Sequence, residues 1–202
     1  MTIEVYADVV CPFTHVGLRR LTDRRDQIGS AESVRVRAWP LELVNGEPLE
    51  ARLVAEEVEE LRRQAAPDLF VGFDPRHFPG SSLPALALVA AAYRTSDQLG
   101  ERVGLAVRHA LFEEGRDIAK PAVLADIARA HSVMAVERRD EATVLAEWHE
   151  GEQRGARGSP HFFVDGDGFF CPFLDISRVG DDLCIRADPI GFDRFVARAL
   201  AA

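Results

Sequence analysis

The chain has 202 residues, enough for one domain with a hydrophobic core or for one domain with a large insertion. It carries 33 acidic and 24 basic residues, for a formal net charge of −9. Nucleic acids and anionic membranes bind basic surfaces, so this balance argues against either as a partner. No apolar run reaches membrane-spanning length, the first residues resemble a strand rather than a signal peptide, and three cysteines do not form a secreted disulfide framework. We therefore expect a cytoplasmic protein.

The N-terminal third predicts a strand, a helix and a second strand. Apolar and polar residues alternate over residues 2–8, which is typical of a strand. Pro12 suits the first turn of a helix, and Gly29 is a good end for a helix that runs to about Ile28. Alternation returns over residues 33–39. The helix is long enough to cross over between two parallel strands.

The middle of the chain predicts helices only. Apolar residues recur at helical spacing, and a segment rich in proline and glycine over residues 67–84 interrupts the pattern. The helices are expected near residues 53–61, 83–93, 101–114, 121–131 and 141–154.

The C-terminal part predicts two strands and a helix. Residues 160–164 and 169–172 flank a hairpin turn sequence, and a final helix follows Asp188. We divide the chain into an N-terminal βαβ part (residues 1–47), a helical insertion (48–151) and a C-terminal ββα part (152–202). Neither β-containing end is stable alone, so both are expected to share one sheet, with the helical block as a cap.

Cys11 is the main candidate for chemistry. It lies between a predicted strand and a predicted helix, directly before Pro12. The free N–H groups and the positive dipole end of a helix N-terminus favour a thiolate, so we expect a thiol pKa below about 8.5. Thr14 lies one helical turn on, where its hydroxyl can bond the sulfur. His15 either acts on the sulfur or packs against the helical cap.

The segment around Pro160 is a second candidate. A proline that follows Gly158 and Ser159 and precedes a strand suits a cis peptide bond that aims a backbone edge into a site. A simple proline at the start of a strand explains the pattern equally well. His161 either lines the site or points away from it.

These segments resemble a known family. Residues 5–20, VYADVVCPFTHVGLRR, are similar to the opening of DsbA-like oxidoreductases of the FrnE type. Residues 155–164, GARGSPHFFV, resemble their cis-proline loop, and residues 112–119 and 121–130 resemble part of their helical insertion. The resemblance implies an α/β thioredoxin-like fold with a large all-helical insertion, and activity in thiol–disulfide exchange. It implies that Cys11 attacks beside Pro160 in cis, and that the Ser159 backbone pairs with a substrate. From the residues themselves we expect Thr14 to support the sulfur, and Pro12, Phe13, His15 and His161 to lie on the substrate side with Ser159.

The sequence departs from the family's usual motif at Thr14, where that motif has a second cysteine. That cysteine normally resolves the mixed disulfide, so ordinary dithiol turnover is not expected. Three explanations stay open. A low-molecular-weight thiol (glutathione or mycothiol) resolves the intermediate, another cysteine does, or the protein is a thiol-cofactor-dependent transferase or isomerase. Kappa-class glutathione transferases and hydroxychromene carboxylate isomerases resemble this architecture and lack the cysteine pair.

Cys171 is the candidate second redox cysteine. A hairpin that turns at Gly166-Asp167 places it opposite Phe162, near Pro160. A buried structural cysteine is the alternative, and Cys184 is a weaker candidate.

The sequence indicates no other kind of site. It has no metal-ligand spacing, and we expect no tightly bound cofactor. Expected partners are a small thiol or disulfide, or a protein disulfide, and the chain is a monomer or a homodimer. A binding module without catalysis remains a further alternative.

Overall fold

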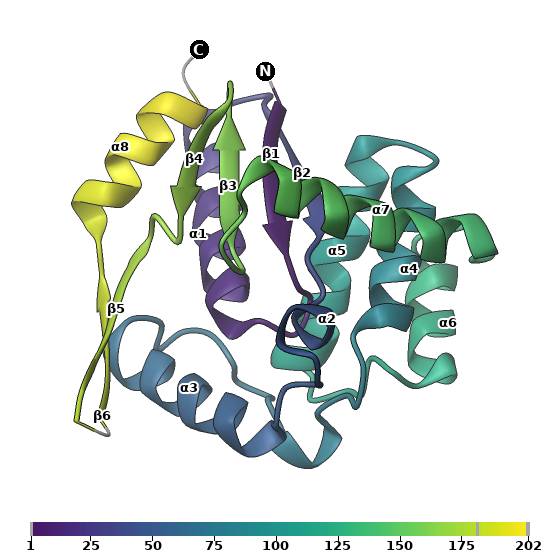
Figure 1. Cartoon of the computed structure of the whole chain (residues 1–202), viewed down its shortest axis with the longest axis horizontal. Helices are drawn as coiled ribbons and strands as arrows, with labels where there is room; N and C mark the ends of the chain where they lie inside the picture. Colours follow the sequence, from purple (N-terminus) through teal and green to yellow (C-terminus); the bar gives the residue numbers. More distant parts are fainter. Residues whose placement is uncertain (1, 181, 201–202) are drawn as a thin grey trace.

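The two β-containing ends of the chain form one sheet, as the sequence predicts. In the computed structural model, which describes residues 2–180 and 182–200, this sheet has the strand order β2-β1-β3-β4 (Figure 1). Strand β1 pairs in parallel with β2, and the other neighbours pair antiparallel. The four strands are β1 (Thr2–Ala7), β2 (Ser33–Ala38), β3 (His161–Val164) and β4 (Asp167–Phe170).

Helix α1 (Pro12–Ile28) connects the two parallel strands. It begins at the proline that the sequence singles out and ends at Gly29, whose φ of +66° is the left-handed conformation that glycine tolerates at a helix end. The buried residues Leu18 and Leu21 pack this helix into the main core. The N-terminus of α1 therefore lies just beyond the end of β1.

Helices cover both faces of the sheet (Figure 1). One face packs on α1 and on α8 (Pro189–Ala199), where Phe195 of α8 contacts Phe162 of β3. On the other face lies α7 (Arg138–Arg154), whose Gly151 is so close to Tyr6 and Trp39 that a Cβ there would lie 2.7 Å from their rings. Both faces of the central strands are thus buried.

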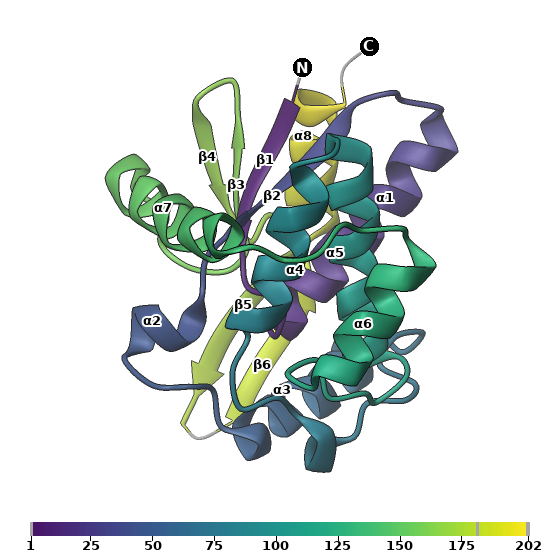
Figure 2. The ribbon, with the colours of Figure 1, turned by 90° about the vertical axis from the view of Figure 1, so that its right-hand side faces the viewer.

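The insertion between β2 and β3 is helical, as predicted (Figure 2). Two helices begin earlier than expected because their N-terminal residues supply caps: Ser96 accepts from the Leu99 N–H, and Glu137 forms a capping box with Asp140. A short helix after β2 was not predicted. The elements are α2 (Leu41–Asn45), α3 (Ala51–Gln64), η1 (Pro75–His77), α4 (Leu83–Tyr93), α5 (Asp97–Phe112), α6 (Pro121–Ala130) and α7.

A second, two-stranded sheet was also missed by the sequence analysis. Strand β5 (Leu174–Val179) pairs with β6 (Asp182–Ala187), and the ribbon lies beside α3 (Figure 1). Only Leu174 of β5 is buried, so this strand lacks the alternation that marks a half-buried strand. Within the described residues, no helix combines the length and apolar character needed to cross a membrane.

Candidate functional site

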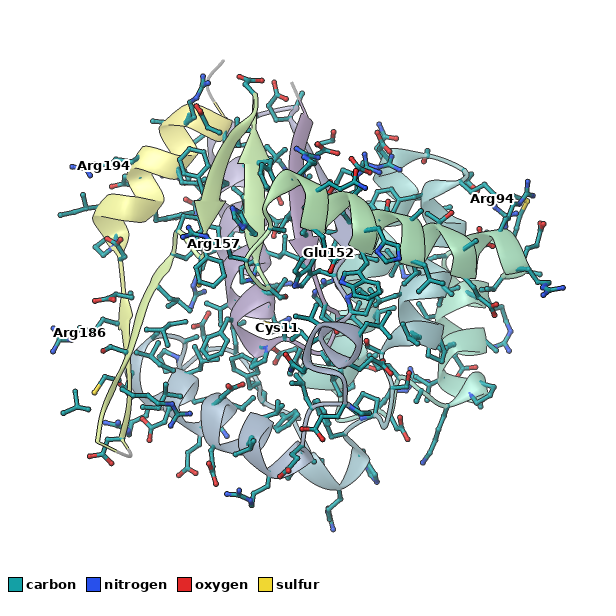
Figure 3. All side chains as sticks on the ribbon, in the orientation of Figure 1. Cys11, Arg94, Glu152, Arg157, Arg186 and Arg194 are labelled. Carbon is teal, nitrogen blue, oxygen red and sulfur yellow. The ribbon has the colours of Figure 1, made fainter. Side chains whose placement is uncertain are left out.

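Cys11 occupies the N-cap position of α1, at the end of the helix that faces α3 (Figure 3). Its sulfur does not accept a capping hydrogen bond from the helix. Instead, the thiol donates to the backbone oxygen of Ser159 at an Sγ–O distance of 3.1 Å. Only 3% of the residue is exposed. The sulfur is therefore held against the turn that precedes β3.

That turn contains the Ser159–Pro160 peptide bond, which is cis. The Ser159 hydroxyl oxygen accepts from the Asp8 N–H at 2.9 Å and lies 2.7 Å from the Thr14 hydroxyl. Asp8 follows β1, Thr14 lies in the first turn of α1, and Ser159 precedes β3. One serine therefore connects the three segments that surround the sulfur.

The ionisation state of Cys11 differs from the sequence expectation. Burial raises the pKa of the Cys11 thiol above its usual value, and the hydroxyls of Thr14 and Ser159 only partly oppose this effect. The nearby Glu57 carboxylate raises it further. The expected lowered pKa of the Cys11 thiol is thus wrong, because the loss of water outweighs the hydrogen bonds that Thr14 and Ser159 supply.

Cys171 lies closer to the turn than predicted. The hairpin turns at Asp165-Gly166, both with positive φ, so Phe162 pairs with Phe169. The predicted pairing of Cys171 with Phe162 is therefore wrong. The Cys171 N–H instead donates to the oxygen of Pro160 at 3.1 Å. Burial, and next the charge of Cys11, raise the pKa of Cys171 to about 12.

His15 packs against the helical insertion, which is the second of the two roles expected for it. Its ring contacts Phe70 and Phe112 of the insertion, and its Nε2 lies 2.7 Å from a carboxylate oxygen of Glu113. Burial lowers the pKa of His15, and Glu113 opposes that shift. This side chain connects α1 to the insertion instead of bonding the sulfur.

The remaining predicted residues divide between the two sides of the sheet. Pro12 is buried at the first position of α1, and Phe13 is half-buried against the main core. His161 stacks on Phe163, and its Nδ1 accepts from the Arg157 N–H at 2.9 Å. The structure thus brings together Cys11, Thr14, Ser159, Pro160 and Cys171, whereas His15 and His161 point to other partners.

The sequence model of the DSBA-like thioredoxin domain family matches residues 2–179. The chain belongs to this family. Among curated proteins, no relative matches it.

Solved structures agree with this DSBA-like fold. A probable DsbA oxidoreductase from Streptomyces coelicolor is 22% identical, with a TM-score of 0.63 over 84% of this chain and 82% of that chain. The cytosolic disulfide reductase DsbM from Pseudomonas aeruginosa is 14% identical, with a TM-score of 0.60 over 98% and 93%. A 2-hydroxychromene-2-carboxylate isomerase is 16% identical, with a TM-score of 0.60 over 84% and 88%. At these identities the likeness concerns the fold.

Two buried ionisable residues of this DSBA-like domain escaped the sequence analysis. Asp8 is fully buried and accepts from the N–H groups of Leu41 and Val10 and from the Ser82 hydroxyl. Arg108 on α5 is 1% exposed and donates to the backbone oxygen of Asp8. Asp8 stands in the quoted motif, three residues before Cys11. Arg108 follows Gly104 by one helical turn, a spacing that leaves room for a guanidinium.

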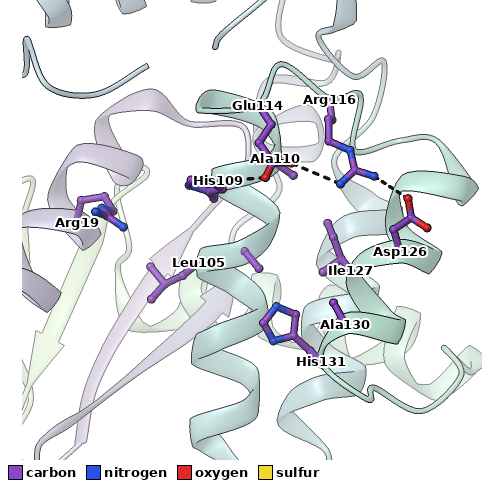
Figure 4. Close-up of a pocket in the computed structure, with 11 residues that line it drawn as sticks. Arg19, Leu105, His109, Ala110, Glu114, Arg116, Asp126, Ile127, Ala130 and His131 are labelled. Carbon is purple, nitrogen blue, oxygen red and sulfur yellow. Dashed lines mark hydrogen bonds and ion pairs between the residues drawn. The ribbon is translucent and has the colours of Figure 1, made fainter. Parts of the chain in front are cut away.

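The larger grooves lie away from the sulfur. A groove of about 440 Å³ between α5 and α6 is lined by side chains such as His109 and His131, and Arg116 bridges Glu114 and Asp126 across it (Figure 4). None of the predicted site residues lines this groove. No group of three or more metal-ligating side chains occurs in the described part of the chain.

Proposed function

We propose that this DSBA-like protein is a monothiol oxidoreductase that reduces mixed disulfides through Cys11. The Cys11 thiolate attacks the small-thiol sulfur of a mixed disulfide, and the other partner leaves as a thiolate that takes up a proton. A second small thiol, after losing its proton, attacks the disulfide on Cys11, releases the Cys11 thiolate and forms the symmetric oxidised thiol. The net reaction converts the mixed disulfide and one free small thiol into the released partner thiol and the symmetric disulfide, so no other reductant is needed.

The proximity of Cys11 to the Ser159–Pro160 turn carries this proposal. The sulfur lies 3.1 Å from the backbone oxygen of the half-buried Ser159, and we propose that an extended disulfide substrate pairs with the backbone of this residue. Thr14 supports the monothiol form, because the resemblance puts the family's second cysteine at this position. Without a resolving thiol in α1, release of the mixed disulfide requires another sulfur.

The resolving thiol that we propose is glutathione or mycothiol in a reducing cytoplasm. Pseudomonas aeruginosa DsbM, a structural neighbour, has been solved with GSH. Cys171 is the competing source of the resolving sulfur, since its backbone bonds Pro160 and its pKa responds to Cys11. Its high pKa makes it a slow attacking group at neutral pH.

The test is turnover of a glutathionylated peptide with reduced glutathione, followed by glutathione reductase and NADPH. We expect activity in the unmodified protein and in Cys171→Ser, and a loss of at least about 100-fold in Cys11→Ser. Loss of activity in Cys171→Ser with retention of the Cys11–glutathione adduct would move the resolving role to Cys171. Full activity in Cys11→Ser would contradict the proposal.

The burial of Cys11 favours one second candidate, a transferase or isomerase that uses a bound small thiol. A residue that is 3% exposed and whose pKa burial raises is a poor nucleophile in the resting state. In that case the small thiol is the reacting sulfur, and Cys11 only shapes its site. Glutathione-dependent isomerisation or transfer that survives Cys11→Ser distinguishes this candidate.

A further inference from the structure

Arg108 is a buried cation without a carboxylate partner in direct contact. Its Nη1 donates to the backbone oxygen of Gly104 at 3.0 Å, and its Nη2 donates to the backbone oxygen of Asp8 at 3.3 Å. Its Nε has no hydrogen-bond partner. Within residues 2–180 and 182–200, both hydrogen bonds of its guanidinium go to backbone oxygens and none to a carboxylate. A guanidinium held among neutral acceptors is costly, and burial lowers the pKa of Arg108 only to about 10. It therefore remains charged at neutral pH.

The backbone oxygen of Asp8 links this cation to the candidate nucleophile. The same oxygen that accepts from Arg108 also accepts from the Cys11 N–H at an N–O distance of 3.4 Å. Asp8 and Cys11 are the two ends of one tight turn. The guanidinium thus contacts the turn that carries both an acidic side chain and the thiol.

We propose that Arg108 is a positioning residue whose single positive charge is shared between the Asp8 carboxylate and the Cys11 thiolate. When Asp8 is ionised, its charge balances Arg108, and loss of the Cys11 proton to water leaves a net negative charge in the interior. When Asp8 has taken up a proton, Arg108 is free to balance the thiolate. The inference rests on the proposed function for its purpose, because a poised thiol is what disulfide exchange requires.

The charges of Asp8, Arg108 and Cys11 affect one another. Burial raises the pKa of Asp8 to about 6, and its hydrogen bonds and Arg108 hold it from rising further. The charge of Cys11 in turn acts on Arg108. Coupled acids of this kind titrate as a group, so one proton affects the affinity of the other site.

Other charged groups face the same cluster and must be separated from it. The charge of Glu57 on α3 raises the pKa of Cys11, and the charge of Arg108 lowers the pKa of His15. The charge of Tyr93 on α4 raises the pKa of Arg108. The charge of Cys11 raises the pKa of Cys171, which follows β4. A pH profile of the unmodified protein sums all of these contributions. The test therefore relies on variants with opposite expected signs.

The experiment measures the rate of iodoacetamide reaction at Cys11 from pH 6 to pH 10 in a Cys171→Ser, Cys184→Ser background. Asp8→Asn removes the competing anion, so we expect a lower thiol pKa and reaction at pH 7 about tenfold faster. Arg108→Gln removes the shared cation, so we expect a higher pKa and reaction about tenfold slower. Arg108→Lys keeps the charge and is expected to lie between Arg108→Gln and the background protein.

Matched surface variants control for charge and for folding. Asp23→Asn on α1 and Arg102→Gln on α5 are exposed changes that should leave the thiol pKa unaltered. A change that merely loosens the core exposes the thiol and speeds its reaction in both buried variants. Shifts of the same sign in Asp8→Asn and Arg108→Gln, or no shift in either, would overturn the proposal. The readout is a thiol pKa, so it is informative even if disulfide turnover is absent.

Discussion

Cys11 and His15 lie one helical turn apart at the start of α1, but their surroundings differ. The sulfur of Cys11 faces the Ser159 turn and keeps its proton, because burial raises its pKa. His15 faces the insertion and bonds Glu113, which stays ionised with a pKa of about 2. Burial by itself would raise the pKa of Glu113, but hydrogen bonds from His15 and from the N–H groups of Phe70 and Val71 lower it.

The difference lies in whether the hydrogen bonds to each acid outweigh its burial, which they do at Glu113 and do not at Cys11. Glu113 accepts three hydrogen bonds, at 2.7, 2.9 and 3.0 Å, and retains some contact with solvent. The sulfur of Cys11 donates its own hydrogen to a carbonyl, an arrangement that exists only while the thiol is protonated. A position at a helix N-terminus is therefore not sufficient to ionise a cysteine. The groups that surround the sulfur decide its charge.

The largest expected effect comes from removing the carboxylate of Glu113, the acid whose hydrogen bonds outweigh its burial. Glu113→Gln leaves His15 and two backbone N–H groups with a weaker acceptor inside the junction of α1 and the insertion. We expect a loss of about 2–3 kcal/mol in the free energy of unfolding, measured in urea. Glu114→Gln, an exposed neighbour, is the matched control and should change stability by less than about 0.5 kcal/mol. Equal losses in the two variants would contradict a structural role for the His15–Glu113 contact.

The next effect is a dependence of stability on acid. The folded-state pKa of Glu113, about 2, is lower than its ordinary value of 4.5, so its contribution to stability is present above about pH 4.5 and is lost as the pH falls towards 2. His15 has a lowered pKa, so stability also declines as the pH falls below 6.5. We expect Glu113 to contribute about 2 kcal/mol between pH 5 and pH 2, measured by urea unfolding at each pH. This contribution should vanish in Glu113→Gln, and an unchanged slope in that variant would argue against it.

Much of the fold follows from local signals in the sequence. Pro12 and Gly29 set the limits of α1, and the alternation in β1 and β2 identifies the parallel pair. The register of β3 and β4 was harder, because Asp165-Gly166 and Gly166-Asp167 are both acceptable turn sequences and only one of them is used. A shift of one residue in the turn moved the partner of Phe162 by two positions.

The site could be predicted only in part. The strand, the cysteine and the proline in sequence order indicate which backbone segments meet, and the resemblance indicates that they meet at Ser159. The environment of the sulfur depends on packing between distant segments, which no local pattern encodes. Arg108 enters the cluster from α5, and Glu57 enters from α3. The protonation of Cys11 therefore could not be inferred from its place at a helix terminus.

The smallest predicted effect concerns Cys11, the acid whose hydrogen bonds do not outweigh its burial. Thr14→Val keeps the shape of a fully buried residue but removes the hydroxyl that lowers the pKa of Cys11. A hydrogen bond to a charged group contributes about 1.5–3 kcal/mol, and the Ser159 hydroxyl can replace part of it, so we expect iodoacetamide reaction at pH 7 about tenfold slower. Thr143→Val, at an exposed position of α7, is the control, and Cys11 in this variant should react at the parental rate. Unchanged or faster reaction in Thr14→Val would mean that this hydroxyl does not stabilise the thiolate.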